Sequence, residues 1–142
     1  MERHGTDVDG FIASLPEANR ADIAALDEMV SDVMAGHPRE LYEGKFWGGS
    51  DQEIIGYGRT QSQRSDKSGV EWFVIGLAMQ KNYISLYVSA VEDGRYIAET
   101  YGPDLGKVKA GKSVISFTSL DDVDSTRLRT MLERARDAST GA

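Results

Sequence analysis

Hydrophobic side chains in the first third of the chain recur at the spacing of α-helices. A short helix is expected from Asp7 to Ser14. A longer helix is expected to begin at Pro16, because the missing N–H of proline costs nothing in the first helical turn, and to run to about Ala35. The hydrophobic residues of this second helix share one face: Ile23, Leu26, Val30, Val33 and Met34. The pattern predicts an amphipathic helix packed on a flat surface.

The middle of the chain changes to the alternating pattern of β-strands. Strands are expected at Leu41–Glu43, Glu53–Gly58, Glu71–Met79 and Tyr83–Val88. In the last of these, aliphatic residues at 84, 86 and 88 alternate with tyrosine or serine, so the aliphatic set is expected to face the helices. Lys81 and Asn82 predict a tight turn between the last two strands. The polar segment Arg59–Ser68 is interpreted as a long hairpin connection.

The last third is expected to alternate between helix and strand. Ala90–Tyr101 predicts a helix, Ser113–Thr118 a strand, and the segment that begins at Asp121 a final helix. This order of elements indicates an α+β fold, with an antiparallel or mixed sheet packed against helices. The 142 residues suit one domain, ordered from about residue 7 to about residue 138.

Composition narrows the classes of function. The chain has no cysteine, which excludes disulfides, thiolate metal sites and thiol catalysis. Its net charge of −7 repels nucleic acid and anionic membrane surfaces, so neither is expected as a partner. The chain opens without an apolar run, and a cytoplasmic protein is therefore expected.

The sequence matches a phosphate-binding motif without the secondary structure that the motif requires. Residues 106–113 read GKVKAGKS, which fits the pattern G-x-x-x-x-G-K-S. That loop binds phosphate only between a buried strand and a helix N-terminus, whereas a β pattern follows here. We therefore expect no nucleotide site at this loop. Lys107 and Lys109 would share one face of an extended segment, which leaves an anion site or a solvated loop as alternatives.

Carboxylates on the second helix offer a candidate metal site. Glu28 and Asp32 lie one helical turn apart on its outer face, in line with Glu17. Oxygen ligands suit hard cations, so this ridge predicts weak binding of Fe²⁺ or a similar ion. The alternative is a solvated face that contributes only charge.

Aromatic side chains on the predicted sheet offer a candidate ligand pocket. Trp47, Tyr57, Tyr87 and Lys112 are predicted to line a shallow pocket for a small anionic or aromatic molecule. The alternative is that the aromatic rings pack beneath a helix as part of the core.

Several segments together resemble the YdhG-like family, which is catalogued as a domain of unknown function. The segments are Val8–Glu17, Trp47–Gly48, Ile55–Gly58, Gln80–Asn82, Ser85–Tyr87, Leu105–Lys107, Gly111–Ser113, Leu120 and Asp122–Asp124. They span nearly the whole chain. The resemblance implies an α+β domain akin to the frataxin-like fold and includes a relative regarded as an intracellular iron chaperone.

The expected function is that of a non-enzymatic domain with weak iron or metal-ion handling. Two alternatives remain open: a module that binds a small molecule or an anion, and a plain protein-interaction domain. The sequence predicts no reaction and leaves the oligomeric state open.

Overall fold

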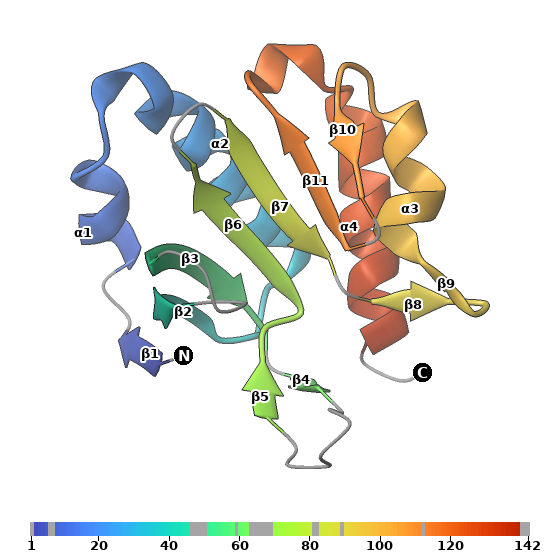
Figure 1. Ribbon diagram of the computed structural model, residues 1–142, viewed down its shortest axis with the longest axis horizontal. Helices are drawn as coiled ribbons and strands as arrows, with labels where there is room; N and C mark the ends of the chain where they lie inside the picture. The colour runs from blue at the N-terminus through green and yellow to red at the C-terminus, as the bar shows by residue number, and fades with distance from the viewer. Residues whose placement is uncertain are drawn as a thin grey trace.

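An antiparallel β-sheet forms the centre of the computed structural model (Figure 1). The structure describes residues 2–5, 8–45, 51–58, 60–62, 70–80, 83–88, 90–111 and 113–139. Within these residues the sheet has seven strands in the order β1-β2-β3-β6-β7-β11-β10, and every neighbouring pair is antiparallel. The strands are β1 (Glu2–Gly5), β2 (Arg39–Lys45), β3 (Asp51–Tyr57), β6 (Ile75–Met79), β7 (Ile84–Val88), β10 (Lys109–Ala110) and β11 (Val114–Phe117). The predicted α+β class with an antiparallel sheet is confirmed.

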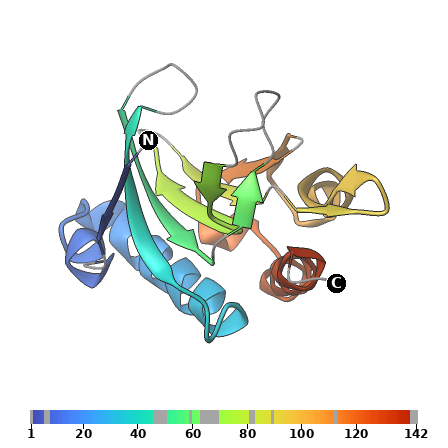
Figure 2. The same cartoon turned by 90° about the horizontal axis from the view of Figure 1, so that it is seen from below.

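The helices in the described residues are α1 (Val8–Ala13), α2 (Glu17–Val33), α3 (Ile97–Tyr101) and α4 (Ser125–Ser139), with short 3₁₀ turns η1 (Gly102–Asp104) and η2 (Leu120–Asp122). The two long helices cover one face of the sheet, and α3 packs beside α4 (Figure 2). Figure 2 shows α2 and α4 on the same side of the sheet, where they also contact each other. None of the helices that the structure describes is long and apolar enough to cross a membrane.

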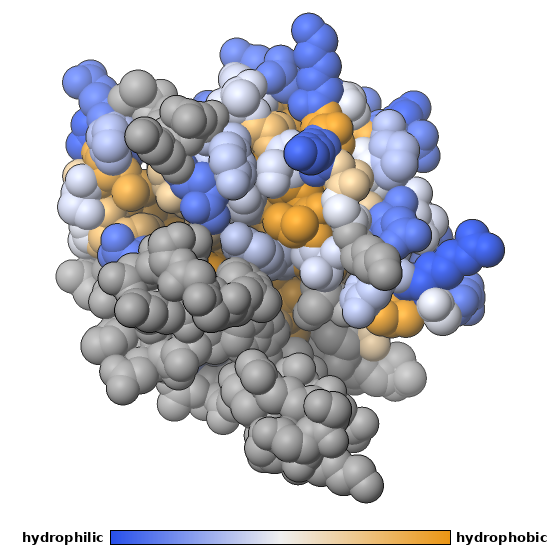
Figure 3. Space-filling model, in the orientation of Figure 1, coloured by the Kyte–Doolittle hydropathy of each residue, from blue (hydrophilic) through white to orange (hydrophobic). Residues whose placement is uncertain are grey.

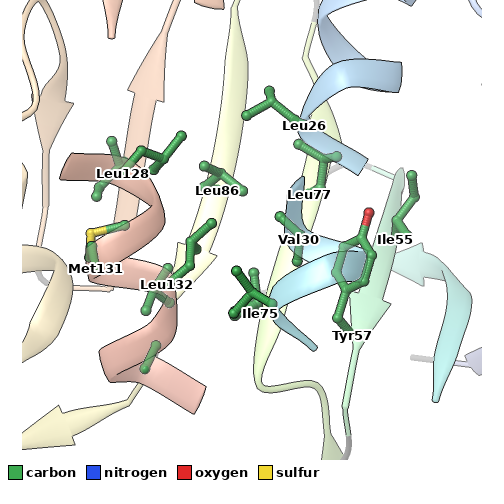
Figure 4. Close-up of a cluster of buried hydrophobic side chains, with 14 of the residues drawn as sticks. Leu26, Val30, Ile55, Tyr57, Ile75, Leu77, Leu86, Leu128, Met131 and Leu132 are labelled. Carbon is green, nitrogen blue, oxygen red and sulfur yellow. The ribbon is translucent and has the colours of Figure 1, made fainter. Parts of the chain in front are cut away.

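The main core lies between the sheet and the two long helices (Figure 4). The predicted inner face of α2 is confirmed, because each of its five hydrophobic residues is buried. The predicted face of α4 is buried as well: Leu128, Met131, Leu132 and Ala135. From the sheet, Ile55, Ile75, Leu77 and Leu86 meet these helices. Burial of this apolar area from water is the main stabilising term of the fold.

A smaller hydrophobic cluster lies on the opposite face of the sheet. Its buried members are Tyr42, Ile54, Phe73 and Ala78, with Tyr87 packed against them. The Tyr42 and Phe73 rings meet edge to face with centroids 5.3 Å apart. The sheet therefore has side chains packed on both faces, and the helices cover only one.

The hairpin of β6 and β7 is confirmed. Its register pairs Met79 with Ile84 and Leu77 with Leu86, and the Gln80 amide donates to the Tyr83 carbonyl over 2.8 Å. The aliphatic residues of β7 are buried against the helices, as their alternation predicts. The turn residues themselves lie outside the described part of the chain.

The single strand predicted at Glu71–Met79 is wrong, because the chain breaks at Phe73 and Val74. Phe73 joins the smaller cluster while Val74 joins the main core, and the Val74 amide donates to the Tyr57 carbonyl. Before the break, β5 (Val70–Trp72) pairs with β4 (Thr60–Ser62) in a separate ribbon. The segment 59–68 is therefore not wholly a loop, and its residues 59 and 63–68 lie outside the described part.

The helix predicted at Ala90–Tyr101 is also wrong over most of its length. A hairpin of β8 (Val91–Glu92) and β9 (Arg95–Tyr96) occupies its first half, and only α3 is helical. Asp93 and Gly94 form the turn with φ of 55° and 80°. An Asp-Gly pair with two positive φ values is the preferred two-residue turn of a β-hairpin, so the turn chemistry overrides the helical spacing.

Two helix boundaries differ slightly from their predicted positions. Pro16 precedes α2 rather than opening it, since its ψ of 139° is extended. The final helix, predicted to begin at Asp121, begins at Ser125 as α4. Asp124 caps it, since its carboxylate accepts a hydrogen bond of 3.1 Å from the Arg127 amide.

Candidate functional site

A pocket of about 640 Å³ lies where β10, β11 and the start of β7 meet. We call it the β10–β11 pocket. It is lined by Tyr83, Lys107, Lys109, Ala110, Gly111, Val114, Ser116, Phe117, Thr118 and Asp122. The volume is within the range of ordinary small-molecule sites, roughly 300–1,000 Å³.

The register of β11 places the pocket on the face opposite the helices. Ser116 pairs with Ser85 of β7 on one side and with Lys109 of β10 on the other. Ile115, the residue between Val114 and Ser116 in β11, is buried in the main core. Because neighbouring residues of a strand point to opposite faces, Val114 and Ser116 face away from α4.

Backbone hydrogen bonds fix the segment that carries the lysines. The Lys107 amide donates to the Asp122 carbonyl over 3.0 Å, and the Gly111 amide donates to the Val114 carbonyl over 2.8 Å. Gly106, with φ of 124°, bridges to Val123, and a Cβ at this glycine would lie 2.3 Å from the Asp122 carbonyl oxygen. Only glycine fits this close approach, which holds Lys107 beside η2.

Charged and apolar groups meet at the pocket. Lys107 and Lys109 are exposed lining residues, and Asp122 is the acidic one. Tyr83 is 43% exposed, which makes it one of the exposed large hydrophobic residues in the described part of the chain. In the space-filling view, orange hydrophobic surface over β11 is bordered by blue hydrophilic side chains (Figure 3).

Two hydroxyl groups complete the lining. Thr118 Oγ1 donates to Asp122 Oδ2 over 3.2 Å. Ser116 Oγ lies 3.4 Å from the Oγ of Ser85, a side chain only 2% exposed. Ser116 is the member of that pair that lines the pocket.

The predicted pocket with Tyr57 and Tyr87 together does not form, because these residues lie on opposite faces of the sheet. Tyr57 pairs with Ile75 and belongs to the main core, whereas Tyr87 pairs with Gly76 and packs on the smaller cluster. The other two predicted pocket residues, at positions 47 and 112, lie outside the described residues.

Tyr57 is packed in the main core beneath α2. Its hydroxyl donates to Asp27 Oδ1 over 2.6 Å, and Arg39 binds both oxygens of the same carboxylate. Burial raises the pKa of the Tyr57 hydroxyl well above its ordinary value, and the charge of Asp27 adds to the rise. The alternative interpretation from sequence, a core aromatic under a helix, holds for this residue.

Tyr87 is half-buried on the other face. Its ring meets that of Phe73 edge to face at 6.4 Å, and its hydroxyl accepts a hydrogen bond from Gln80 Nε2 over 3.2 Å. Burial raises the pKa of the Tyr87 hydroxyl. Tyr87 pairs with Val114 across β7 and β11, so it neighbours the β10–β11 pocket without lining it.

The predicted metal ligands do not converge on one ion. Glu17 and Glu28 lie on α2 about 16 Å apart along the axis, at 1.5 Å per residue. Asp32 forms an ion pair with Arg129 of α4. Within the described residues, no group of three His, Asp or Glu side chains lies close enough together to hold a metal ion. The geometry favours the solvated-face interpretation of this ridge.

The segment with the phosphate-binding letters leads into β11, as the sequence predicts. Residues 114–117 are extended and pair with β7 and β10, so no helix N-terminus follows Ser113. The geometry that would hold a nucleotide phosphate is missing from the described residues that follow the motif.

Sequence reasoning found part of the β10–β11 pocket. The sequence predicts Lys107 and Lys109 on one face of an extended segment, and both line the pocket. Tyr83, Phe117 and Asp122 were missed as site residues, because they come from three separate segments that only the strand pairing brings together.

Comparisons with protein-family models, with curated proteins and with solved structures find no match to this chain. Membership of the YdhG-like family and likeness to the frataxin-like fold stay predictions.

Proposed function

We propose that this protein is a binding module for a small anionic molecule, held in the β10–β11 pocket. The observation that carries the proposal is the pairing of two lysines with an apolar hollow in a chain of net charge −7. A cationic spot on an acidic surface attracts anions locally, while the rest of the surface repels them.

The preformed backbone around the pocket supports this proposal. The hydrogen bonds of Lys107 and Gly111 to their neighbours hold the lysine-bearing segment in place. A site that is already ordered loses less conformational entropy when a ligand binds, which leaves more of the contact energy for affinity. A solvated turn would need none of the apolar lining that Tyr83 and Val114 contribute.

A ligand screen on matched variants tests the proposal. A panel of small carboxylates, phosphates, sulfates and sulfonates is measured by thermal shift, and each hit is then measured by calorimetry at low salt. We expect at least one anion to bind saturably, with affinity that falls about tenfold in Lys109→Ala.

The matched control is Arg95→Ala, which removes the same charge from the exposed β9, outside the pocket. We expect this variant to bind as the unmodified protein does. An equal loss in both variants would show a general charge effect and contradict the proposed site. A panel without any hit would contradict the function itself.

A further inference from the structure

The charge of the described pocket lining favours a singly charged ligand. Lys107 and Lys109 contribute two positive charges and Asp122 one negative charge. A monoanion balances the excess, whereas a dianion brings a second negative charge close to the Asp122 carboxylate, and like charges at short range repel.

The hydroxyl groups of the pocket point to the same conclusion. The Thr118 hydroxyl proton is already donated to Asp122. Ser116 Oγ lies 3.4 Å from Oγ of the buried Ser85, longer than a typical O–H···O hydrogen bond, so the Ser116 hydroxyl can rotate and donate to a ligand. One hydroxyl and two flexible ammonium groups suit the two oxygens of a carboxylate.

The apolar wall indicates what the rest of the ligand is. Tyr83 and Val114 line the pocket together, and the Tyr83 ring is left 43% exposed. Covering an exposed aromatic ring with an apolar group removes both surfaces from water. An inorganic anion would leave this wall uncovered.

This inference rests on the proposed function: we infer that the ligand is a monocarboxylate with an aromatic or branched apolar body. Its carboxylate lies between Lys107 and Lys109 and accepts a hydrogen bond from Ser116. Its apolar body covers the wall formed by Tyr83 and Val114.

Four probes separate the parts of this inference by calorimetry at pH 7 and low salt. Phenylacetate has the charge and the ring, phenylacetamide has the ring without the charge, and acetate and inorganic phosphate have a charge without the ring. We expect phenylacetate to bind saturably, phenylacetamide at least tenfold more weakly, and acetate and phosphate without saturation.

Three variants place the binding. Lys109→Gln keeps a polar side chain and removes the charge, so phenylacetate affinity is expected to fall about tenfold. Lys109→Arg restores the charge and is expected to restore most of the affinity. Tyr83→Ser is expected to weaken the binding of phenylacetate. Its melting temperature is expected to stay close to that of the unmodified protein, since this side chain is exposed.

Each contrary result has a distinct meaning. Phosphate that binds as tightly as phenylacetate, and is lost in Lys109→Gln, overturns the ligand class and leaves the proposed function standing. Equal affinity for phenylacetate and phenylacetamide overturns the role of the charge. Absence of binding by all four probes overturns the inference, whereas the broader anion panel decides the proposed function.

Discussion

The Tyr57 hydroxyl donates a hydrogen bond of 2.6 Å to Asp27 Oδ1, joining strand β3 to helix α2. Arg39 of β2 binds the same carboxylate through Nε at 3.0 Å and Nη2 at 2.6 Å, and its Nη2 also reaches Asp9 of α1 at 2.9 Å. The hydrogen bond to Asp27 raises the pKa of Arg39, so the guanidinium stays charged. One partly buried network thus fixes α1 and α2 to strands β2 and β3.

The first prediction concerns the loss of this hydrogen bond. Tyr57→Phe keeps the ring in the core and removes its hydroxyl. Because the acceptor is a charged, mostly buried carboxylate, we expect the free energy of unfolding to fall by about 1.5–3 kcal/mol. Urea denaturation at pH 7 measures the change.

Tyr96→Phe is the control for that measurement. Tyr96 is 37% exposed on β9, and substitutions at such positions usually change stability by less than about 0.5 kcal/mol. Equal effects of the two substitutions would show that the bond to Asp27 contributes nothing specific.

The second prediction is a dependence of stability on alkaline pH. An unfolded tyrosine ionises near pH 10, whereas burial raises the pKa of folded Tyr57 well above that value. Above about pH 10 the unfolded chain loses this proton first, so stability falls as pH rises, by about 1.4 kcal/mol per pH unit for one proton. Below that pH the contribution is fully present.

Urea denaturation of the unmodified protein and of Tyr57→Phe between pH 8 and pH 11 measures this dependence. Tyr87 and Tyr101, whose pKa values are also raised, titrate in both proteins and cancel in the difference. We expect the gap between the two proteins to narrow as pH rises above 10. A gap that stays constant would mean that Tyr57 ionises equally in the folded and unfolded states.

Local patterns in the sequence predict the parts of the fold that depend on a single element. The five residues predicted for the inner face of the second helix repeat at helical spacing and all are buried, and the alternation in β7 puts Ile84, Leu86 and Val88 on the helix side. These assignments need no knowledge of the neighbouring strands. The hairpin at Asp93 and Gly94 was also readable from its turn chemistry, which the helical spacing of 90–101 obscured.

The faces of residues on different strands depend on register, which one sequence does not contain. Tyr57 pairs with Ile75, which pairs with Val88, and so it shares the helix-covered face with the aliphatic set. A shift of one residue would move Tyr57 to the face of Tyr87. The same limit explains why Tyr83 and Asp122 were not predicted to join Lys109 in one pocket.

The third prediction tests the packing of the smaller cluster. A Cβ at Gly56 would lie 2.4 Å from Tyr42 Cε1 and 2.9 Å from Phe73 Cβ, so neighbouring side chains must move. We expect Gly56→Ala to destabilise the protein by about 1–3 kcal/mol, which thermal or urea denaturation measures.

A double-mutant cycle identifies the cause of that loss. In a Tyr42→Ala background the closest contact is gone, and Gly56→Ala is expected to cost at least about 0.5 kcal/mol less than in the unmodified protein. An unchanged cost would assign the effect to the backbone and contradict the packing explanation.

The fourth prediction concerns nucleotides. Because β11 and not a helix follows residues 106–113, ATP with Mg²⁺ is expected to show no saturable binding that Lys112→Ala removes. Calorimetry on the two proteins measures this. Micromolar ATP binding that disappears in the variant would contradict our interpretation of the motif.

The central claim, that the β10–β11 pocket holds a small anion, is tested most directly by amide chemical-shift mapping. Phenylacetate is titrated into ¹⁵N-labelled protein at pH 7. We predict saturable shifts grouped at residues 107–118, with Tyr83 and Asp122, and none along α1 and the first turns of α2. Shifts grouped on another part of the chain, or no saturable shifts with any anion of the panel, would contradict the claim.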